Sequence, residues 1–185
     1  MSKQVLIKTK QRVIDHGEVF TPAHIVEMMC NKVPKEQWED PSHIFLEPTC
    51  GNGNFLVHML KKRLDAGVSL HDSLNSLWGM DICSDNIREC HERLSEIVAT
   101  RIIEKGHSKK TKKFREHLKK AGAIILNNIY VVSDSIAEVK TKRFENKKFV
   151  YKDPTGETGV LEPDEARSLE NQYEESDVYK KILEK

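Results

Sequence analysis

A glycine-rich turn between two apolar segments carries the clearest chemical signal in this sequence. The turn spans residues 47–55 and follows a short apolar run at 43–46. Gly51 and Gly53 allow the backbone to approach a ligand closely and to adopt positive φ angles. The helix expected after the turn offers unpaired N–H groups at its first residues. Glu47 would repel a phosphate here, so the turn favours a ligand with an ammonium or sulfonium group.

A second carboxylate, Asp81, lies at the end of the next apolar run, residues 77–82. A carboxylate at the end of a strand can accept hydrogen bonds from ribose hydroxyls. Together, Glu47 and Asp81 indicate a nucleoside with a cationic, amino-acid-like extension. S-adenosylmethionine has this chemistry.

Four segments resemble the motifs of the adenine-N6 DNA methyltransferases. Residues 47–55 resemble the first motif, in which Glu-Pro-x-Cys-Gly-x-Gly-x-Phe is kept. Residues 17–22, Gly-Glu-Val-Phe-Thr-Pro, resemble the motif that precedes it in type I modification subunits and many type II enzymes. Residues 79–82 resemble the second motif and residues 133–136 the third. The resemblance covers roughly residues 12–136, and the chain is similar to a short member of the family.

The resemblance implies S-adenosylmethionine as the cofactor and a role for each matching position. Thr21 would hold the methionine carboxylate, and Asp81 would bind the ribose hydroxyls. Ile82 would pack on the adenine, and Asp134 would accept from its amino group. Thr21 as a helix N-cap and Asp134 as a turn residue are the structural alternatives. The expected cofactor-binding residues are Thr21, Pro22, Glu47, Pro48, Cys50, Gly51, Gly53, Phe55, Asp81, Ile82 and Asp134.

The family's catalytic motif, (Asn/Asp/Ser)-Pro-Pro-aromatic, does not occur in the sequence. In the family, this motif holds the amino group of an adenine that has been flipped out of the duplex. The nearest match is at residues 153–156, Asp-Pro-Thr-Gly, after an apolar run at 149–151. Asp153 and Pro154 are therefore the candidate catalytic residues, and a simple turn is the alternative.

The order of elements predicts an α/β fold with a Rossmann-like, doubly wound, mostly parallel sheet. We expect strands at residues 43–46 and 77–82, and at one or both of 123–126 and 129–132. Thr21-Pro22 should open a helix, residues 34–42 should form a loop, and 55–66 a helix. The resemblance implies the class I S-adenosylmethionine-dependent methyltransferase fold, incomplete at its C-terminal side.

Charge divides the 185 residues more clearly than the overall composition does. The net charge is +1, yet residues 101–120 hold nine basic and two acidic residues, and residues 153–185 hold ten acidic and four basic. We expect an N-terminal arm at 1–16, a cofactor-binding domain at 17–152 and an acidic, weakly structured tail at 153–185. The basic stretch is either a solvated surface or a contact for DNA phosphates, and the tail could cover it.

Several classes of protein are not expected. No apolar run is long enough to span a membrane, and residues 1–10 lack the apolar core of a signal peptide. The four cysteines contain no C-x-x-C pair, which favours a reduced cytoplasmic protein without a metal site.

The leading hypothesis is a DNA adenine-N6 methyltransferase that needs a partner, such as a specificity subunit, for target recognition. The alternative is a catalytically inactive cofactor-binding protein that acts as a regulatory subunit or a restriction antagonist. A small-molecule methyltransferase or a cofactor-degrading enzyme on the same fold ranks last.

Overall fold

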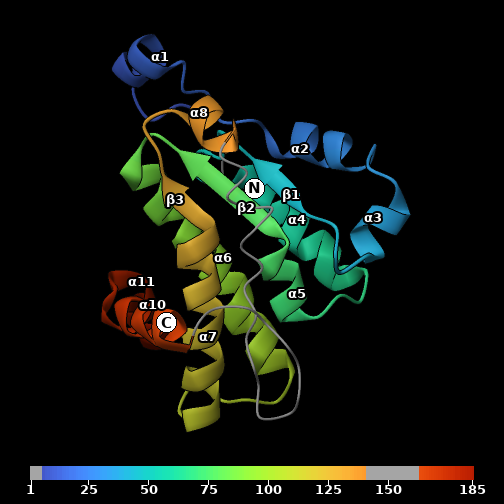
Figure 1. Ribbon diagram of the computed structural model, residues 1–185, viewed down its shortest axis with the longest axis vertical. Coiled ribbons are helices and arrows are strands. Elements are labelled where there is room, and N and C mark those ends of the chain that lie inside the picture. Colours follow the sequence, from blue (N-terminus) through green and yellow to red (C-terminus); the bar gives the residue numbers. More distant parts are fainter. Residues whose placement is uncertain (1–5, 141–162) are drawn as a thin grey trace.

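The computed structural model describes residues 6–140 and 163–185 and has an α/β architecture (Figure 1). Its described residues contain one parallel sheet of three strands in the order β1-β2-β3. The strands are β1 (Phe45–Glu47), β2 (Leu77–Asp81) and β3 (Ile129–Val131). The central strand is almost wholly buried, as expected of a parallel strand covered on both faces.

The strand register brings the predicted acidic residues to one edge of the sheet. Glu47 pairs with Gly79, and Asp81 pairs with Val131. Since the strands are parallel, their carboxyl ends lie at the same edge. This is the edge at which open α/β sheets bind ligands.

Four helices connect the strands and pack against the sheet. Helices α4 (Asn54–Asp65) and α5 (Leu70–Asn75) link β1 to β2, and α6 (Ser84–Glu104) and α7 (Lys112–Asn128) link β2 to β3. The apolar residues of α4 recur at helical spacing, and Leu56, Leu60 and Leu64 are all buried. Helix α8 (Ser135–Lys140) follows β3.

Three short helices precede the sheet. Helix α1 (Lys10–His16) has no buried residue, whereas α2 (Ala23–Cys30) buries Val26 and Cys30 and packs against α4. Helix α3 (Lys35–Glu39) buries Trp38, whose ring stacks on Phe45 with centroids 4.5 Å apart.

Residues 163–185 of the expected C-terminal tail are mostly helical, which corrects the expectation of a weakly structured segment for this part of it. Helices α10 (Pro163–Glu175) and α11 (Asp177–Glu184) pack beside α7 and α6 (Figure 1). Tyr173 is 0% exposed, and its hydroxyl donates to Ser95 Oγ at 2.7 Å. The few apolar residues of this acidic segment are mostly buried where α10 and α11 pack against the rest of the protein. Its average composition therefore does not show that it folds.

Other expectations also change. Residues 34–42 contain α3 rather than only a loop, and residues 123–126 continue α7, so β3 is the strand of that region. Pro22, not Thr21, is the N-cap of α2. The strand order proceeds in one direction across residues 6–140, so the reversal of a doubly wound sheet is not among the described residues. The apolar run at 149–151, a candidate for a further strand, lies outside the described residues.

Within residues 6–140 and 163–185, no helix is long and apolar enough to cross a bilayer. The same residues hold no cluster of three or more His, Cys, Asp or Glu side chains suited to a metal ion.

Candidate cofactor-binding site

A cleft of about 380 Å³ lies at the carboxyl edge of the sheet. It is formed by four segments: residues 16–21, the turn after β1, the end of β2, and Ser135 at the start of α8. Seven of the predicted cofactor-binding residues line it: Thr21, Glu47, Cys50, Gly51, Phe55, Asp81 and Ile82. Pro22, Pro48, Gly53 and Asp134 are not among the lining residues.

The two glycines of the turn have different structural roles. Both have positive φ, 52° for Gly51 and 84° for Gly53. A Cβ atom on Gly51 would lie 3.2 Å from the Phe20 ring, on the wall of the cleft. A Cβ atom on Gly53 would lie 2.4 Å from Cys90 Sγ, inside the contact between the start of α4 and α6. Gly51 therefore shapes the cleft, and Gly53 allows α4 to approach α6.

The Asp81 side chain connects the end of β2 to the turn that follows β1. Its Oδ2 accepts from the Gly51 backbone N–H at 2.9 Å, and its Oδ1 accepts from the Cys83 N–H at 2.9 Å. The Asn86 side-chain nitrogen donates to the same Oδ1 at 3.3 Å. These bonds hold the carboxylate in place on the cleft wall, and Oδ2, which accepts only the Gly51 N–H among the described residues, has a second lone pair for a ligand hydroxyl.

Glu47 is a partly buried carboxylate with weak internal partners. Its Oε1 accepts from the backbone N–H and the hydroxyl of Thr49, both at 3.3 Å, which is long for hydrogen bonds. Burial raises the pKa of Glu47 above its ordinary value. A cation in the cleft would favour the charged form, so this position suits an ammonium or sulfonium group.

Thr21 lies on the cleft because its segment is tied to the start of α4. The Asn54 side-chain nitrogen donates to the Thr21 carbonyl at 2.9 Å. Arg93 in turn donates to Asn54 Oδ1 at 2.8 Å and to the Asn52 carbonyl at 2.7 Å. The cleft wall is thus connected to α6 by side-chain hydrogen bonds.

Cys50 is a buried neutral part of the wall. Its hydrogen bond with Cys90, together with burial, raises the pKa of the Cys50 thiol, so the thiolate is disfavoured.

Asp134 is exposed, and its carboxylate caps α8. Its Oδ1 accepts from the Ile136 and Ala137 N–H groups at 2.9 and 3.1 Å. The neighbouring Ser135 is the residue of this segment that lines the cleft. Asp153 and Pro154 lie outside the described residues.

Sequence reasoning did not single out several residues of this region, among them Glu18, Phe20 and Asn86. Glu18 and Phe20 line the cleft, and both fall in the motif at residues 17–22, where spacing could have indicated them. Asn86 is 1% exposed and bonds Asp81 from the first turn of α6. No sequence signal marks Asn86, because its contact depends on how α6 packs.

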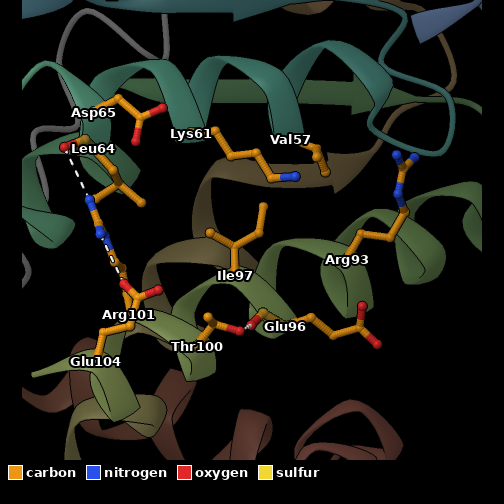
Figure 2. A pocket seen from close by; sticks show the side chains of 10 residues that line it. All are labelled: Val57, Lys61, Leu64, Asp65, Arg93, Glu96, Ile97, Thr100, Arg101 and Glu104. Atoms are coloured by element: carbon orange, nitrogen blue, oxygen red, sulfur yellow. Dashed lines mark hydrogen bonds and ion pairs between the residues drawn. The ribbon is translucent and has the colours of Figure 1, made fainter. Parts of the chain in front are cut away.

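A second cavity, of about 490 Å³, lies between α4 and α6 (Figure 2). None of the predicted site residues lines it. Arg101 crosses one end, where it donates to the Leu64 carbonyl at 3.2 Å and pairs with Glu104 at 2.9 Å. The residues predicted to bind the cofactor therefore line the smaller cleft and not this cavity.

The basic stretch at 101–120 lies far from the cleft. Helix α6 begins three residues after Asp81 and runs for 21 residues, a length of about 30 Å, away from the cleft edge (Figure 1). The stretch comprises the end of α6, the following loop and the start of α7. Lys119 pairs with Glu174 at 3.0 Å, and Lys109 donates to the Ile182 carbonyl at 3.0 Å. The C-terminal helices therefore cover part of it.

A family model described as N-6 DNA Methylase matches residues 5–159. No curated protein and no solved structure gives a match.

Proposed function

Since this chain belongs to the N-6 DNA methylase family, we propose that its cleft binds S-adenosylmethionine and that it methylates N6 of adenine in DNA. The observation that carries the proposal is the convergence of Thr21, Glu47, Gly51 and Asp81 on one cleft. These residues come from three segments that are far apart in the sequence.

The cleft suits each part of the cofactor. Asp81 is held at the end of β2, where it can accept from ribose hydroxyls, and Ile82 is 53% exposed and available to an adenine ring. Glu47 would hold the methionine amino group, and Thr21 would hold the methionine carboxylate. When bound, S-adenosylmethionine supplies an activated methyl group. The fold proposed on this basis is the class I methyltransferase fold. Asp134, whose neighbour Ser135 lines the cleft, is proposed to lie near the adenine.

The acceptor side of the reaction is assigned to DNA. A target adenine must leave the duplex to reach a cleft of this kind. Asp153 and Pro154 are proposed to accept hydrogen bonds from its amino group. A specificity subunit is proposed to supply target recognition.

The position of the basic stretch restricts its proposed role. The stretch begins near the far end of α6, a helix about 30 Å long that starts at the cleft edge. Residues 101–120 would therefore contact phosphates that flank the target rather than the target itself.

The second candidate is a cofactor-binding protein without methyl transfer, acting as a regulatory subunit or a restriction antagonist. The sequence observation that favours it is the absence of (Asn/Asp/Ser)-Pro-Pro-aromatic. Without the aromatic residue, a flipped base would lose a stacking partner worth about 1–3 kcal/mol.

One paired experiment separates the candidates. Calorimetry measures S-adenosylmethionine binding, and tritium transfer to unmethylated DNA measures catalysis. Asp81→Ala should weaken binding, whereas Asp65→Ala, an acid on the other cavity, should not. Binding with transfer supports the enzyme, and binding without transfer supports the second candidate. Absence of binding would remove both.

A further inference from the structure

Three buried polar atoms without a partner lie around Glu18. Among the described residues, Glu18 Oε1, Asn86 Oδ1 and Arg12 Nε make no hydrogen bond. The Glu18 side chain is only 8% exposed, and the residue lines the cleft. Buried polar atoms nearly always have partners, so this cluster needs an explanation beyond packing.

The other oxygen of Glu18 is fully engaged. Arg12 Nη2 pairs with Oε2, and Asn86 Nδ2 donates to the same oxygen at 2.7 Å. These two bonds fix the carboxylate, so Oε1 has a defined position with no donor among the described residues. Because Glu18 lines the cleft, this buried acceptor without a partner is suited to a ligand that carries a hydrogen-bond donor.

Asn86 connects Glu18 to Asp81, the residue proposed to bind the ribose. Its single nitrogen donates to Glu18 Oε2 at 2.7 Å and to Asp81 Oδ1 at 3.3 Å. The two carboxylates are therefore neighbours that share one donor. Their mutual repulsion is offset by Arg12, which also pairs with Asp85 at 2.7 Å.

We propose that Glu18 is a second carboxylate of the ribose subsite, and that its Oε1 accepts from one hydroxyl of the cofactor's ribose while Asp81 accepts from the other. The inference rests on the proposed function, because it assumes that a nucleoside occupies the cleft. Asn86 holds the two carboxylates as neighbours, and each has an oxygen that can accept from a ligand, Glu18 Oε1 and Asp81 Oδ2. A vicinal diol supplies two donors side by side, which suits two such acceptors.

The test is calorimetric and compares ligands as well as variants. S-adenosylhomocysteine and its 2′-deoxy and 3′-deoxy forms are titrated into the wild type and Glu18→Gln. Glu18→Gln should weaken binding of S-adenosylhomocysteine by about ten- to a hundredfold. The factor should fall close to one for the deoxy form that lacks the hydroxyl bound by Glu18. The control is Asp15→Asn, which removes one exposed negative charge from the same arm and should change nothing.

The outcomes are distinct. An equal loss for all three ligands means that Glu18 acts only by holding the arm, and this overturns the inference, as does no loss at all. If Glu18→Gln does not fold, Glu18→Asp keeps the charge but withdraws the oxygen and should show the same selectivity. Failure of the wild type to bind any of the ligands would instead remove the proposed function, and the inference with it.

Discussion

At the scale of single residues, the glycines of the turn give the sharpest stability prediction. Gly53→Ala should destabilise the protein by about 2–5 kcal/mol, because a positive φ is strained for alanine and the new Cβ meets Cys90 Sγ. Gly67→Ala is the matched control, with φ of 86° and open space around it. It should cost only the strain, about 1–2 kcal/mol. Urea denaturation measures both, and equal losses would contradict the packing role of Gly53.

Glu47 should show a conflict between stability and binding. Burial raises the pKa of Glu47, so its charged form destabilises the folded state. Stability should therefore fall as pH rises from the unfolded-state pKa through the raised folded-state pKa. Glu47→Gln should lack this fall, and its denaturation midpoint should exceed that of the wild type at pH 7 more than at pH 4.

The same substitution should weaken binding of the proposed cofactor, because it removes the negative charge that would attract the methionine ammonium group. The control is Glu27→Gln, an exposed glutamate on α2, which should shift neither the midpoint nor the affinity. A lower midpoint for Glu47→Gln at neutral pH would contradict the sign of the predicted effect.

At the scale of elements, the C-terminal helices are part of the core. Tyr173→Ala should cost about 3–5 kcal/mol, as expected for a fully buried aromatic residue. Tyr173→Phe should cost about 1 kcal/mol, since it removes only the hydrogen bond to Ser95. Denaturation of the full chain measures both, and an unchanged Tyr173→Ala would mean that α10 does not dock.

The N-terminal arm depends on charge, because α1 has no buried residue. Lys8 and Arg12 both pair with Asp85, and they hold the pKa of that carboxyl well below its usual range. The attachment should therefore persist in mild acid and be lost only as pH falls through the depressed pKa. Asp85→Asn should speed hydrogen exchange at residues 10–16, whereas Asp65→Asn should not. Unchanged exchange in Asp85→Asn would exclude this attachment.

Sequence periodicity predicted the elements beside the turn better than those far from it. The β2 strand and the helix after the glycines were predicted because burial gives them strong patterns. Residues 123–126 are apolar enough for a strand, but Phe114, Leu118 and Ala121 extend the same helical face into them. Helix α3 was missed because it is five residues long, and its stability comes from the stacking of Trp38 on Phe45.

The site residues were predictable where the residue type and its place at a strand end indicate a single kind of ligand contact. Asp81 and Glu47 follow from strand ends and ligand charge alone, and both line the cleft. Asn86 was not predictable, because it donates to two carboxylates, Glu18 and Asp81, that only the fold brings together. Asp134 was expected to contact the adenine or to act as a turn residue, and in the structure its carboxylate caps the start of α8.

At the scale of the whole molecule, the carboxyl ends of the strands, where the cleft lies, are far from the basic stretch at residues 101–120 (Figure 1). Replacing Lys110, Lys112 and Lys113 with Gln should leave cofactor affinity unchanged because of this separation. If these residues contact flanking phosphates, the salt dependence of DNA affinity should fall by roughly one unit of slope per lost contact. Lys32→Gln and Lys35→Gln provide the control for general charge. An unchanged slope in the triple variant would remove DNA from this surface.

The hydrogen bond from Gly51 to Asp81 has a kinetic consequence. This bond forms within the chain itself. The turn after β1 and the end of β2 are therefore already fixed relative to each other. Binding to such a site need not order a loop, and little conformational entropy is lost on association. We therefore expect a single fast binding phase whose rate rises in proportion to ligand concentration, without the plateau that a slow closing step would impose.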